Sequence, residues 1–178
     1  ICWAGKDWHC ALDAATKGVA ILPEPETLGY EADAQRALGD TEGARRTTDL
    51  IYAVERVGNA YRLNDRLLSV YYAQHGVRLD DALRIAQREV RVRGNEIYAQ
   101  DTLAWAAAMS QHWNLADRAA ARAMRYHTQD PRIEYHAGMI ALHFGRNDQA
   151  RRLLRQALSR NAQFDPVYAG NARQTLAS

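Results

Sequence analysis

The sequence predicts an all-α fold in which antiparallel helix pairs stack into one solenoid domain over residues 1–178. Three observations lead to this prediction. Amphipathic helical segments recur about every 34 residues, small residues recur at that same offset, and prolines fall only at boundaries between segments. A fixed period of this length is typical of helical repeats, in which each pair of helices buries its apolar face against its neighbours.

The clearest pair of helices is predicted over residues 131–165, which begin PRIEYHAGMIALHFG and continue through RNDQARRLLRQALSR. Asp130 is the expected N-cap of the first helix, and Pro131 stands where a missing N–H costs nothing. Gly145 is expected to end that helix, and Asn147 to cap the second. Gly138 and Ala141 are small enough for a neighbouring helix to approach closely.

The preceding pair is predicted over residues 95–130, with Asn95 and Asn114 as the expected helix caps. Small residues in this segment recur about 34 residues later in the next one, which supports the period. The matching positions are Ala104 and Gly138, Ala116 and Ala150, and Ala123 and Ala157.

Two further pairs are predicted over residues 25–58 and 59–94, with turns at Gly39 and Gly76 and with Asp80 as a helix cap. The offset between these two units exceeds the usual period by about four residues. A longer helix or turn near Val57–Tyr61 is expected to absorb the difference.

The two ends of the chain are predicted to be atypical. Residues 1–24 have the pattern of the second half of a unit, and Ile1 stands at what looks like the end of a helix, so a fragment or processed product is expected. Residues 166–178 are expected to form a capping helix, because a solenoid needs a more polar last helix to cover its open end.

These segments resemble tetratricopeptide-repeat (TPR) proteins, and in particular a group of uncharacterised bacterial members with stretches close to DTLAWAAA, EYHAGMIALHFG and QALSRNAQFDP. The resemblance covers essentially the whole chain. It implies a right-handed superhelix whose concave groove is lined by the first helices, used as a scaffold for protein binding. The large aromatic residue that the pattern expects near the start of each first helix is replaced by Leu28, Arg66, Gln100 and Glu134.

Composition excludes several other classes of protein. The net charge is +2, which gives no strong basic field for nucleic acid or an anionic membrane. No apolar run is long enough to span a membrane, and the compartment, cytoplasmic or exported, stays open. Cys2 and Cys10 are expected to be a pair of small buried residues, or a disulfide if they fall on adjacent antiparallel helices.

The groove predicted from the resemblance would be lined by first-helix side chains that do not face the core. Aromatic residues, methionine and few charges are the mixture favoured at protein-binding surfaces. A peptide or protein segment is therefore the expected partner, and replacing Trp105 and Tyr135 together by Ala is expected to weaken its binding while helical content stays near wild type. The expected contact residues are Tyr71, His75, Tyr98, Asp101, Trp105, Met109, Arg132, Tyr135, His136, Met139 and His143.

Other kinds of site are disfavoured. His136 and His143 share a helix face but lie two turns apart without further ligands, so neither a metal nor another cofactor is expected. No serine stands in a nucleophile elbow and no Gly-rich phosphate loop occurs, so the protein is not expected to be an enzyme. Of the positions that grip a terminal carboxylate in some such proteins, only Arg132 could serve.

Two alternatives stay open beside the peptide-binding scaffold. In the first, another copy of the chain fills the groove or covers an end, which makes a self-association module. In the second, single-stranded RNA binds to arginines of the second helices, although such runs are more often solvated outer faces. The runs are Arg84, Arg88 and Arg91, and Arg151, Arg152 and Arg155.

Overall fold

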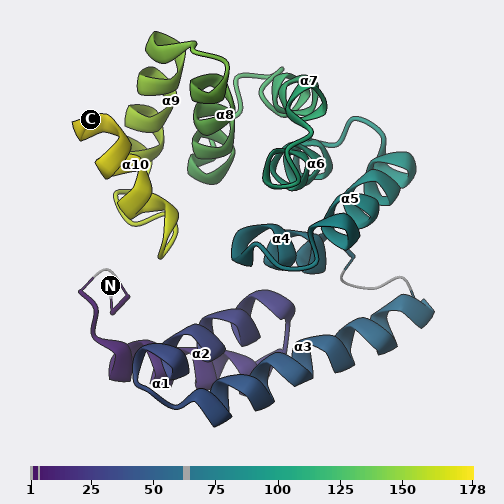
Figure 1. The fold of residues 1–178 in the computed structure, drawn as a ribbon, viewed down its shortest axis with the longest axis vertical. Helices are drawn as coiled ribbons and strands as arrows, with labels where there is room; N and C mark the ends of the chain where they lie inside the picture. The colour runs from purple at the N-terminus through teal and green to yellow at the C-terminus, as the bar shows by residue number, and fades with distance from the viewer. Residues whose placement is uncertain (1, 4, 62–64) are drawn as a thin grey trace.

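The computed structural model of the protein describes residues 2–3, 5–61 and 65–178, which form ten α-helices and no β-strand (Figure 1). The fold is therefore all-helical, as predicted. Ile1 and residues 62–64 lie outside the described residues, so the expected helix end at Ile1 and part of the expected first helix of the third unit are not described. The helices are α1 (Trp8–Ile21), α2 (Pro25–Ala37), α3 (Thr41–Tyr61), α4 (Asp65–His75), α5 (Leu79–Arg93), α6 (Ile97–Met109), α7 (Trp113–Ala123), α8 (Pro131–His143), α9 (Asn147–Arg160) and α10 (Tyr168–Ala177).

The α8–α9 hairpin shows how local sequence produces the repeated unit. The Asp130 carboxylate accepts hydrogen bonds from the N–H groups of Arg132 and Ile133, at 2.9 and 3.3 Å, which confirms the predicted N-cap. Gly145 ends α8 with a φ of 70°, a left-handed conformation that glycine adopts without strain. A Cβ atom on Gly138 would lie only 3.1 Å from Leu154 Cδ2, so the small residue does permit the close approach of α9.

Four predicted helix caps are displaced in the structure. α9 begins at Asn147 itself, with Arg146 as the capping residue. α6 begins after Glu96 rather than Asn95, because the Glu96 carboxylate accepts the N–H groups of Tyr98 and Ala99. Likewise, the cap of α7 is His112 instead of Asn114, and the cap of α5 is Arg78 instead of Asp80. The helices themselves stand where the periodicity predicts them.

The longest helix lies where the repeat period is stretched. α3 spans 21 residues and continues to Tyr61, beyond the boundary predicted at residue 58. The extra length near Val57–Tyr61 is the feature expected to absorb the longer offset between the second and third units.

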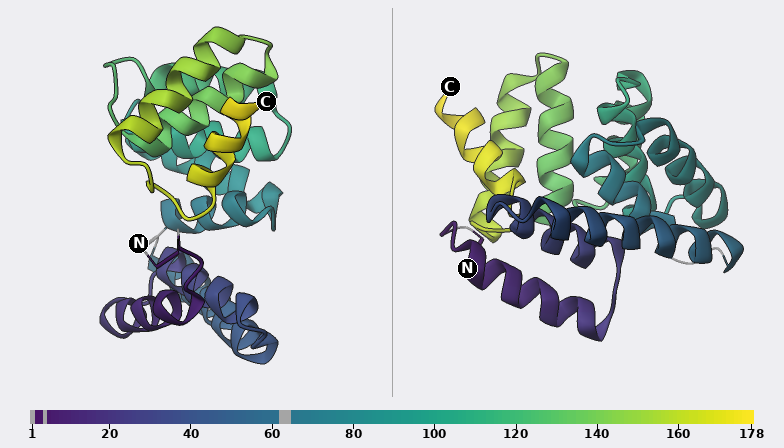
Figure 2. Two further views of the ribbon diagram at one scale, coloured as in Figure 1. Left: turned by 90° about the vertical axis from the view of Figure 1, so that its left-hand side faces the viewer. Right: turned by 60° about the horizontal axis from the view of Figure 1, so that its bottom comes forward.

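The helices are arranged in two layers. The first helices of successive hairpins, α2, α4, α6 and α8, each contact the next along the row, while the second helices lie outside them. α1 packs on α2 at one end, and α10 covers α9 at the other. The row curves so strongly that α1–α3 face α8–α10, and both termini lie on the same side of the molecule (Figures 1 and 2).

The curved row is bridged across its inner side by long side chains. The Arg132 guanidinium of α8 lies 2.6 Å from the Glu26 carboxylate of α2 and donates to the Tyr30 hydroxyl at 3.0 Å. Its Nε atom lies 3.7 Å from the Asp165 carboxylate, which also accepts a 3.4 Å hydrogen bond from Gln74 of α4. Within the described helices, no Cα atoms of α2 and α8 approach within 8 Å. α2 and α8 are therefore joined through side chains.

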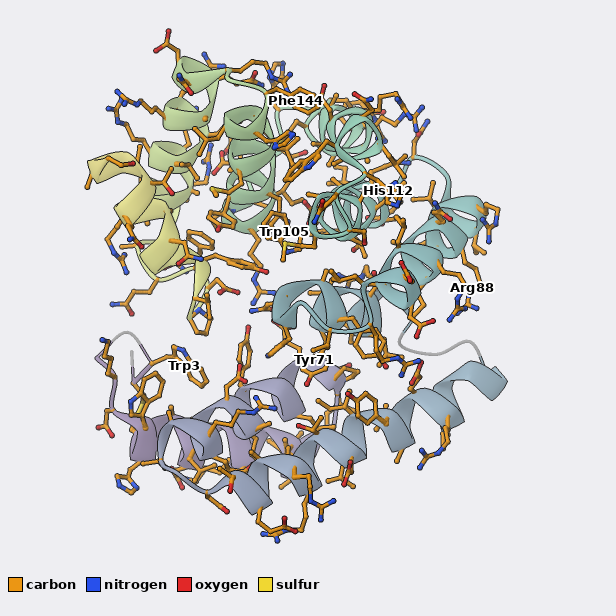
Figure 3. All side chains as sticks on the ribbon, viewed as in Figure 1. Trp3, Tyr71, Arg88, Trp105, His112 and Phe144 are labelled. Atoms are coloured by element: carbon orange, nitrogen blue, oxygen red, sulfur yellow. A yellow bond between two sulfur atoms is a disulfide. The ribbon has the colours of Figure 1, made fainter. Side chains whose placement is uncertain are left out.

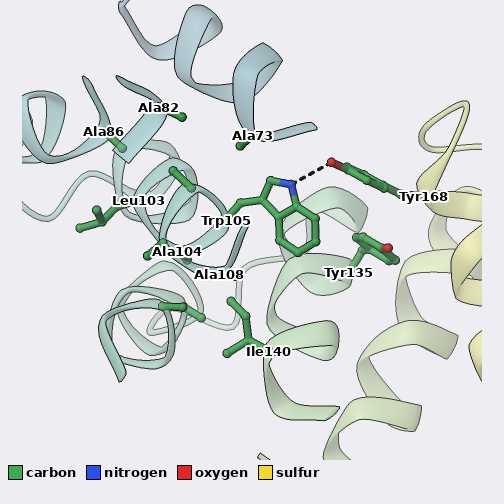
Figure 4. Close-up of a cluster of buried hydrophobic side chains, with 14 of the residues drawn as sticks. Ala73, Ala82, Ala86, Leu103, Ala104, Trp105, Ala108, Tyr135, Ile140 and Tyr168 are labelled. Carbon is green, nitrogen blue, oxygen red and sulfur yellow. Dashed lines mark hydrogen bonds between the residues drawn. The ribbon is translucent and has the colours of Figure 1, made fainter. Parts of the chain in front are cut away.

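The core combines small residues between helices with an aromatic cluster near the C-terminal end. Many alanines of α6, α7 and α9 are fully buried, which lets the helices stack closely. The aromatic cluster centres on Trp105, whose indole N–H donates to the Tyr168 hydroxyl at 2.8 Å, beside the Tyr135 ring (Figure 4).

Cys2 and Cys10 form a disulfide, with Cα atoms 5.5 Å apart. The expectation of two small buried residues is therefore wrong, and the two cysteines do not lie on adjacent antiparallel helices. The segment before α1 turns back instead, with the Asp7 N–H donating to the Cys2 carbonyl at 3.0 Å, so Cys2 meets the exposed first turn of α1.

None of the described helices combines the length and the hydropathy that a bilayer-spanning segment requires.

Candidate binding pocket on the inner face

A pocket of about 310 Å³ opens on the inner face, where the first turns of α4, α6 and α8 lie side by side. These helices run in the same direction in successive hairpins, so their N-terminal turns meet at one edge of the inner layer. We call this space the inner pocket. Its wall consists of Glu26, Arg66, Leu67, Val70, Tyr98, Asp101, Thr102, Asp130, Pro131, Arg132, Ile133, His136 and Phe164.

A buried histidine–carboxylate pair forms part of the wall. His136 Nδ1 lies 3.0 and 3.1 Å from the two carboxylate oxygens of Asp101, which joins α8 to α6. Next to a carboxylate, Nδ1 carries the proton of the neutral ring, so Nε2 is a hydrogen-bond acceptor. The His136 side chain is almost fully buried, and its Nε2 atom has no hydrogen-bond partner among the described residues. The imidazole stacks on Trp105 with ring centroids 4.3 Å apart, which fixes its plane.

The charged groups of the pocket differ in how they are paired. Asp130 is engaged as the cap of α8, and Arg132 is held by Glu26 and Asp165. Arg66 makes no ion pair with the described residues, and its guanidinium lies over the Tyr98 ring, 5.7 Å from the centroid. Among the described residues of the wall, Arg66 is thus the cation that is open to a new partner.

Tyr30 stands behind Arg132 and completes the bridge to α2. Its hydroxyl donates to Glu26 Oε1 at 3.0 Å and accepts from Arg132. Burial raises the pKa of Tyr30 far above its ordinary value, so the hydroxyl stays protonated at neutral pH and can serve as a donor.

Four of the predicted contact residues line the inner pocket: Tyr98, Asp101, Arg132 and His136. Of these, only Tyr98 offers a large exposed surface, with 49% of its area accessible. Asp101 and His136 form a buried pair that reaches the pocket wall only at its edge. Arg132 connects the wall to α2.

Three predicted aromatic contact residues are core residues instead. Trp105 is 8% exposed and Tyr135 is 2% exposed, and both pack into the cluster with Tyr168. Tyr71 is also buried, between α4 and Gly29 of α2 (Figure 3). Trp105 and Tyr135 are buried because Tyr168 of the C-terminal segment packs against both rings. Replacing Trp105 and Tyr135 together is therefore expected to lower stability, contrary to the expectation from the sequence.

The remaining predicted contact residues lie away from the pocket. His75 joins α4 to α2, since its Nε2 atom lies 3.0 Å from the Asp33 carboxylate and its Nδ1 atom 2.9 Å from the Tyr71 carbonyl. Met109 and Met139 are partly buried against the core. His143 stacks on Trp113 at the opposite end of the hairpins, with ring centroids 3.5 Å apart. None of these four side chains lines the inner pocket.

Glu26, Arg66 and Phe164 line the pocket but are absent from the contact residues expected from the sequence. Arg66 gave a signal, because it replaces the aromatic residue that the repeat pattern expects at the start of a first helix. Glu26 comes from the N-terminal helices, which the curvature of the row brings near α8, whereas Phe164 follows α9, which packs on α8.

The wall of the inner pocket carries hydrogen-bonding and charged groups. The described residues contain no group of three or more His, Cys, Asp or Glu side chains arranged to hold a metal ion. The partly exposed side chains of the pocket wall include a cation at Arg66, an aromatic ring at Tyr98 and apolar groups at Leu67 and Val70.

This two-layered row of helical hairpins is a TPR-like α-solenoid. The structure is similar to the crystal structure of a thermophilic TPR protein from Thermus thermophilus, with a TM-score of 0.59 and 20% sequence identity, over 99% of this chain and 94% of that one. Comparison of the sequence with protein-family models and with curated proteins gives no match. The predicted all-α TPR-like fold is confirmed, and the right-handed twist stays a prediction.

Proposed function

We propose that this protein is a non-catalytic scaffold that binds an extended segment of a partner protein along its inner face. A TPR-like fold supports a role in protein interaction in general. The observation that carries the finer proposal is the inner pocket, which three consecutive first helices build together. Its volume of about 310 Å³ lies at the lower end of the range of ligand pockets.

The wall indicates how a segment would be held. Tyr98 and Arg66 offer an exposed aromatic face and an open cation at the rim, a combination frequent among residues that dominate binding energy. The apolar wall between them would receive one side chain.

The proposal can be tested without knowing the natural partner. Short random peptides displayed on phage would be selected on the intact protein, and the affinity of the selected peptides measured by fluorescence polarisation. Tyr98→Ala is expected to weaken binding by about tenfold or more, as truncation of an interface aromatic typically does. Tyr126→Ala is the matched control, because Tyr126 is also exposed, at 69%, but does not line the pocket.

The outcome that contradicts the proposal is equally clear. If selected peptides bind the Tyr98→Ala and Tyr126→Ala variants with the wild-type affinity, the inner pocket is not where segments bind.

A further inference from the structure

Positive charge is concentrated in the C-terminal half of the chain. Residues 113–160 contain nine arginines and four carboxylate residues, whereas the rest of the chain contains 14 basic and 17 acidic residues. A small net charge for the whole molecule therefore hides a basic region built on α7 and α9. Such a local concentration attracts acidic partners even when the whole protein is nearly neutral.

The outer face of the molecule is hollowed between α7 and α9. Both helices pack against α8, but within the described helices no Cα atoms of α7 and α9 come within 8 Å of each other. A hollow of about 230 Å³ lies between them. We call it the outer groove. Its floor is apolar and consists of Ala120, Ala121, Met124, Ala137 and Leu153, and its walls are Asp117, His127, Arg146, Gln149 and Arg152.

The groove is continued by a shallow second hollow along α9, which shares Arg152 with the first. Arg152, Arg155 and Arg160 line this hollow, and every side chain in its wall can donate a hydrogen bond. Along α9, the apolar floor of the outer groove therefore lies next to a basic rim.

Several arginines of α7 and α9 are open to a partner, of which Arg152 and Arg155 line the hollows. Arg146 is paired with Asp117, and Arg160 with Glu134. Within the part of the chain that the structure describes, Arg118, Arg122, Arg151, Arg152 and Arg155 are exposed and form no ion pair.

We propose that the outer groove is a second docking surface, distinct from the inner pocket, for an acidic polypeptide segment. An apolar side chain of the segment occupies the floor, and its carboxylates pair with Arg152 and Arg155. Charge complementarity selects the occupant, because guanidinium groups bind carboxylates in a bidentate geometry. A polypeptide fits better than single-stranded nucleic acid, because the lining of the groove contains no Phe, Tyr or Trp on which bases could stack.

The test uses three fluorescein-labelled probes at low salt, with fluorescence polarisation as the readout. The first probe is a short amphipathic peptide of Glu and Leu, the second is the same peptide with Gln in place of Glu, and the third is a short single-stranded RNA. The Glu peptide is expected to bind, and the Gln peptide to bind about tenfold more weakly or less, since its carboxylates are lost.

The double variant Arg152→Gln, Arg155→Gln is expected to reduce binding of the Glu peptide by about tenfold. Arg45→Gln, Arg46→Gln is the matched control, because it removes two exposed arginines from α3, far along the chain from the outer groove. The control variant is expected to bind within about twofold of wild type, and so is the inner-pocket variant Tyr98→Ala. All four arginines are exposed, so circular dichroism should show a wild-type fold.

Three results would overturn the proposal. The Glu peptide fails to bind; or it binds the Arg152/Arg155 variant as tightly as wild type; or RNA binds more tightly than the peptide and loses affinity in that variant, which would make the surface a nucleic-acid site. None of these results bears on peptide binding at the inner pocket, which Tyr98→Ala tests separately.

Discussion

At the scale of single residues, polar and aromatic side chains of the first helices are held in place by buried partners. Asp101 pairs with His136, Trp105 donates to Tyr168, and Glu134 accepts from Arg160. The first two contacts join different hairpins, whereas Glu134 and Arg160 join the two helices of one hairpin. A polar residue on a first helix is therefore not in itself a sign of a binding surface.

Removal of Arg160 is expected to lower stability, because it leaves a buried carboxylate without its counter-ion. Both Glu134 oxygens accept from Arg160 Nε, at 2.8 and 2.9 Å, and Glu134 is fully buried. Arg160→Met is expected to lower the free energy of unfolding by about 3 kcal/mol, measured by urea titration. The double variant with Glu134→Gln should recover part of that loss, because no charge then stays buried. Equal stability of the single and double variants would show that the carboxylate is not the cause.

Trp105 is expected to behave as a core residue. Trp105→Ala should lower the free energy of unfolding by about 3–5 kcal/mol, because it opens a cavity among Tyr135, His136 and Tyr168. Trp105→Phe should fall between that variant and wild type, since it keeps a ring but leaves the Tyr168 hydroxyl without its donor. Chemical denaturation followed by circular dichroism measures both. Wild-type stability of Trp105→Ala would instead mean that this indole is a surface contact residue.

At the scale of helices, spacing between neighbours decides which small residues are required. Gly29 and Gly138 stand where another helix comes close, whereas a Cβ atom on Gly170 would meet nothing within 4 Å. Glycine is unfavourable inside a helix, and at Gly29 and Gly138 the close approach of a neighbouring side chain outweighs that cost.

Two glycine substitutions are expected to have opposite effects. Gly29→Ala would place a Cβ atom 2.9 Å from Cε2 of the buried Tyr71 ring, and is expected to lower stability by about 1–3 kcal/mol. Gly170→Ala, the matched control in α10, is expected to raise stability by about 0.5–1 kcal/mol through helix propensity. Thermal unfolding checks both. A stabilising Gly29→Ala would mean that α2 and α4 are farther apart than described.

At the scale of the whole molecule, the Arg132 bridge makes this solenoid differ from a simple stack. In such a stack each repeat contacts only its neighbours. Here Arg132 of α8 reaches Glu26 and Tyr30 of α2, across the inner face. The two ends of the row are thus coupled by an ion pair of partly exposed groups, which added salt weakens.

Loss of the bridge is expected to loosen the N-terminal helices without unfolding the molecule. Arg132→Gln should increase hydrogen exchange of α1 and α2 several-fold, because local opening no longer breaks the contacts to α8. Lys17→Gln is the control, since the exposed Lys17 pairs with Asp13 of its own helix, α1. High salt should have the same effect on the wild-type protein and little on Arg132→Gln. Unchanged exchange in the variant would show that the bridge carries no stability.

The sequence predicts the hairpins well and the inner face poorly, for a physical reason. Helix positions, the Asp130 cap and the close approach at Gly138 depend on residues near one another in the chain, so local periodicity reveals them. The burial of Trp105 and Tyr135 depends on contact with Tyr168, which is too far along the chain for a local pattern to reveal. Contacts between Tyr30 and Arg132, separated by 102 residues, are fixed only by the sum of all hairpin angles.

The bridge between α2 and α8 also limits how the number of helical hairpins in this protein can change. An open row of repeats tolerates duplication or deletion of one unit, because every junction is alike. Here an inserted hairpin would carry Arg132 away from Glu26, and a deleted one would drive the two ends into collision. A change in the number of hairpins would therefore cost this molecule the contact between α2 and α8.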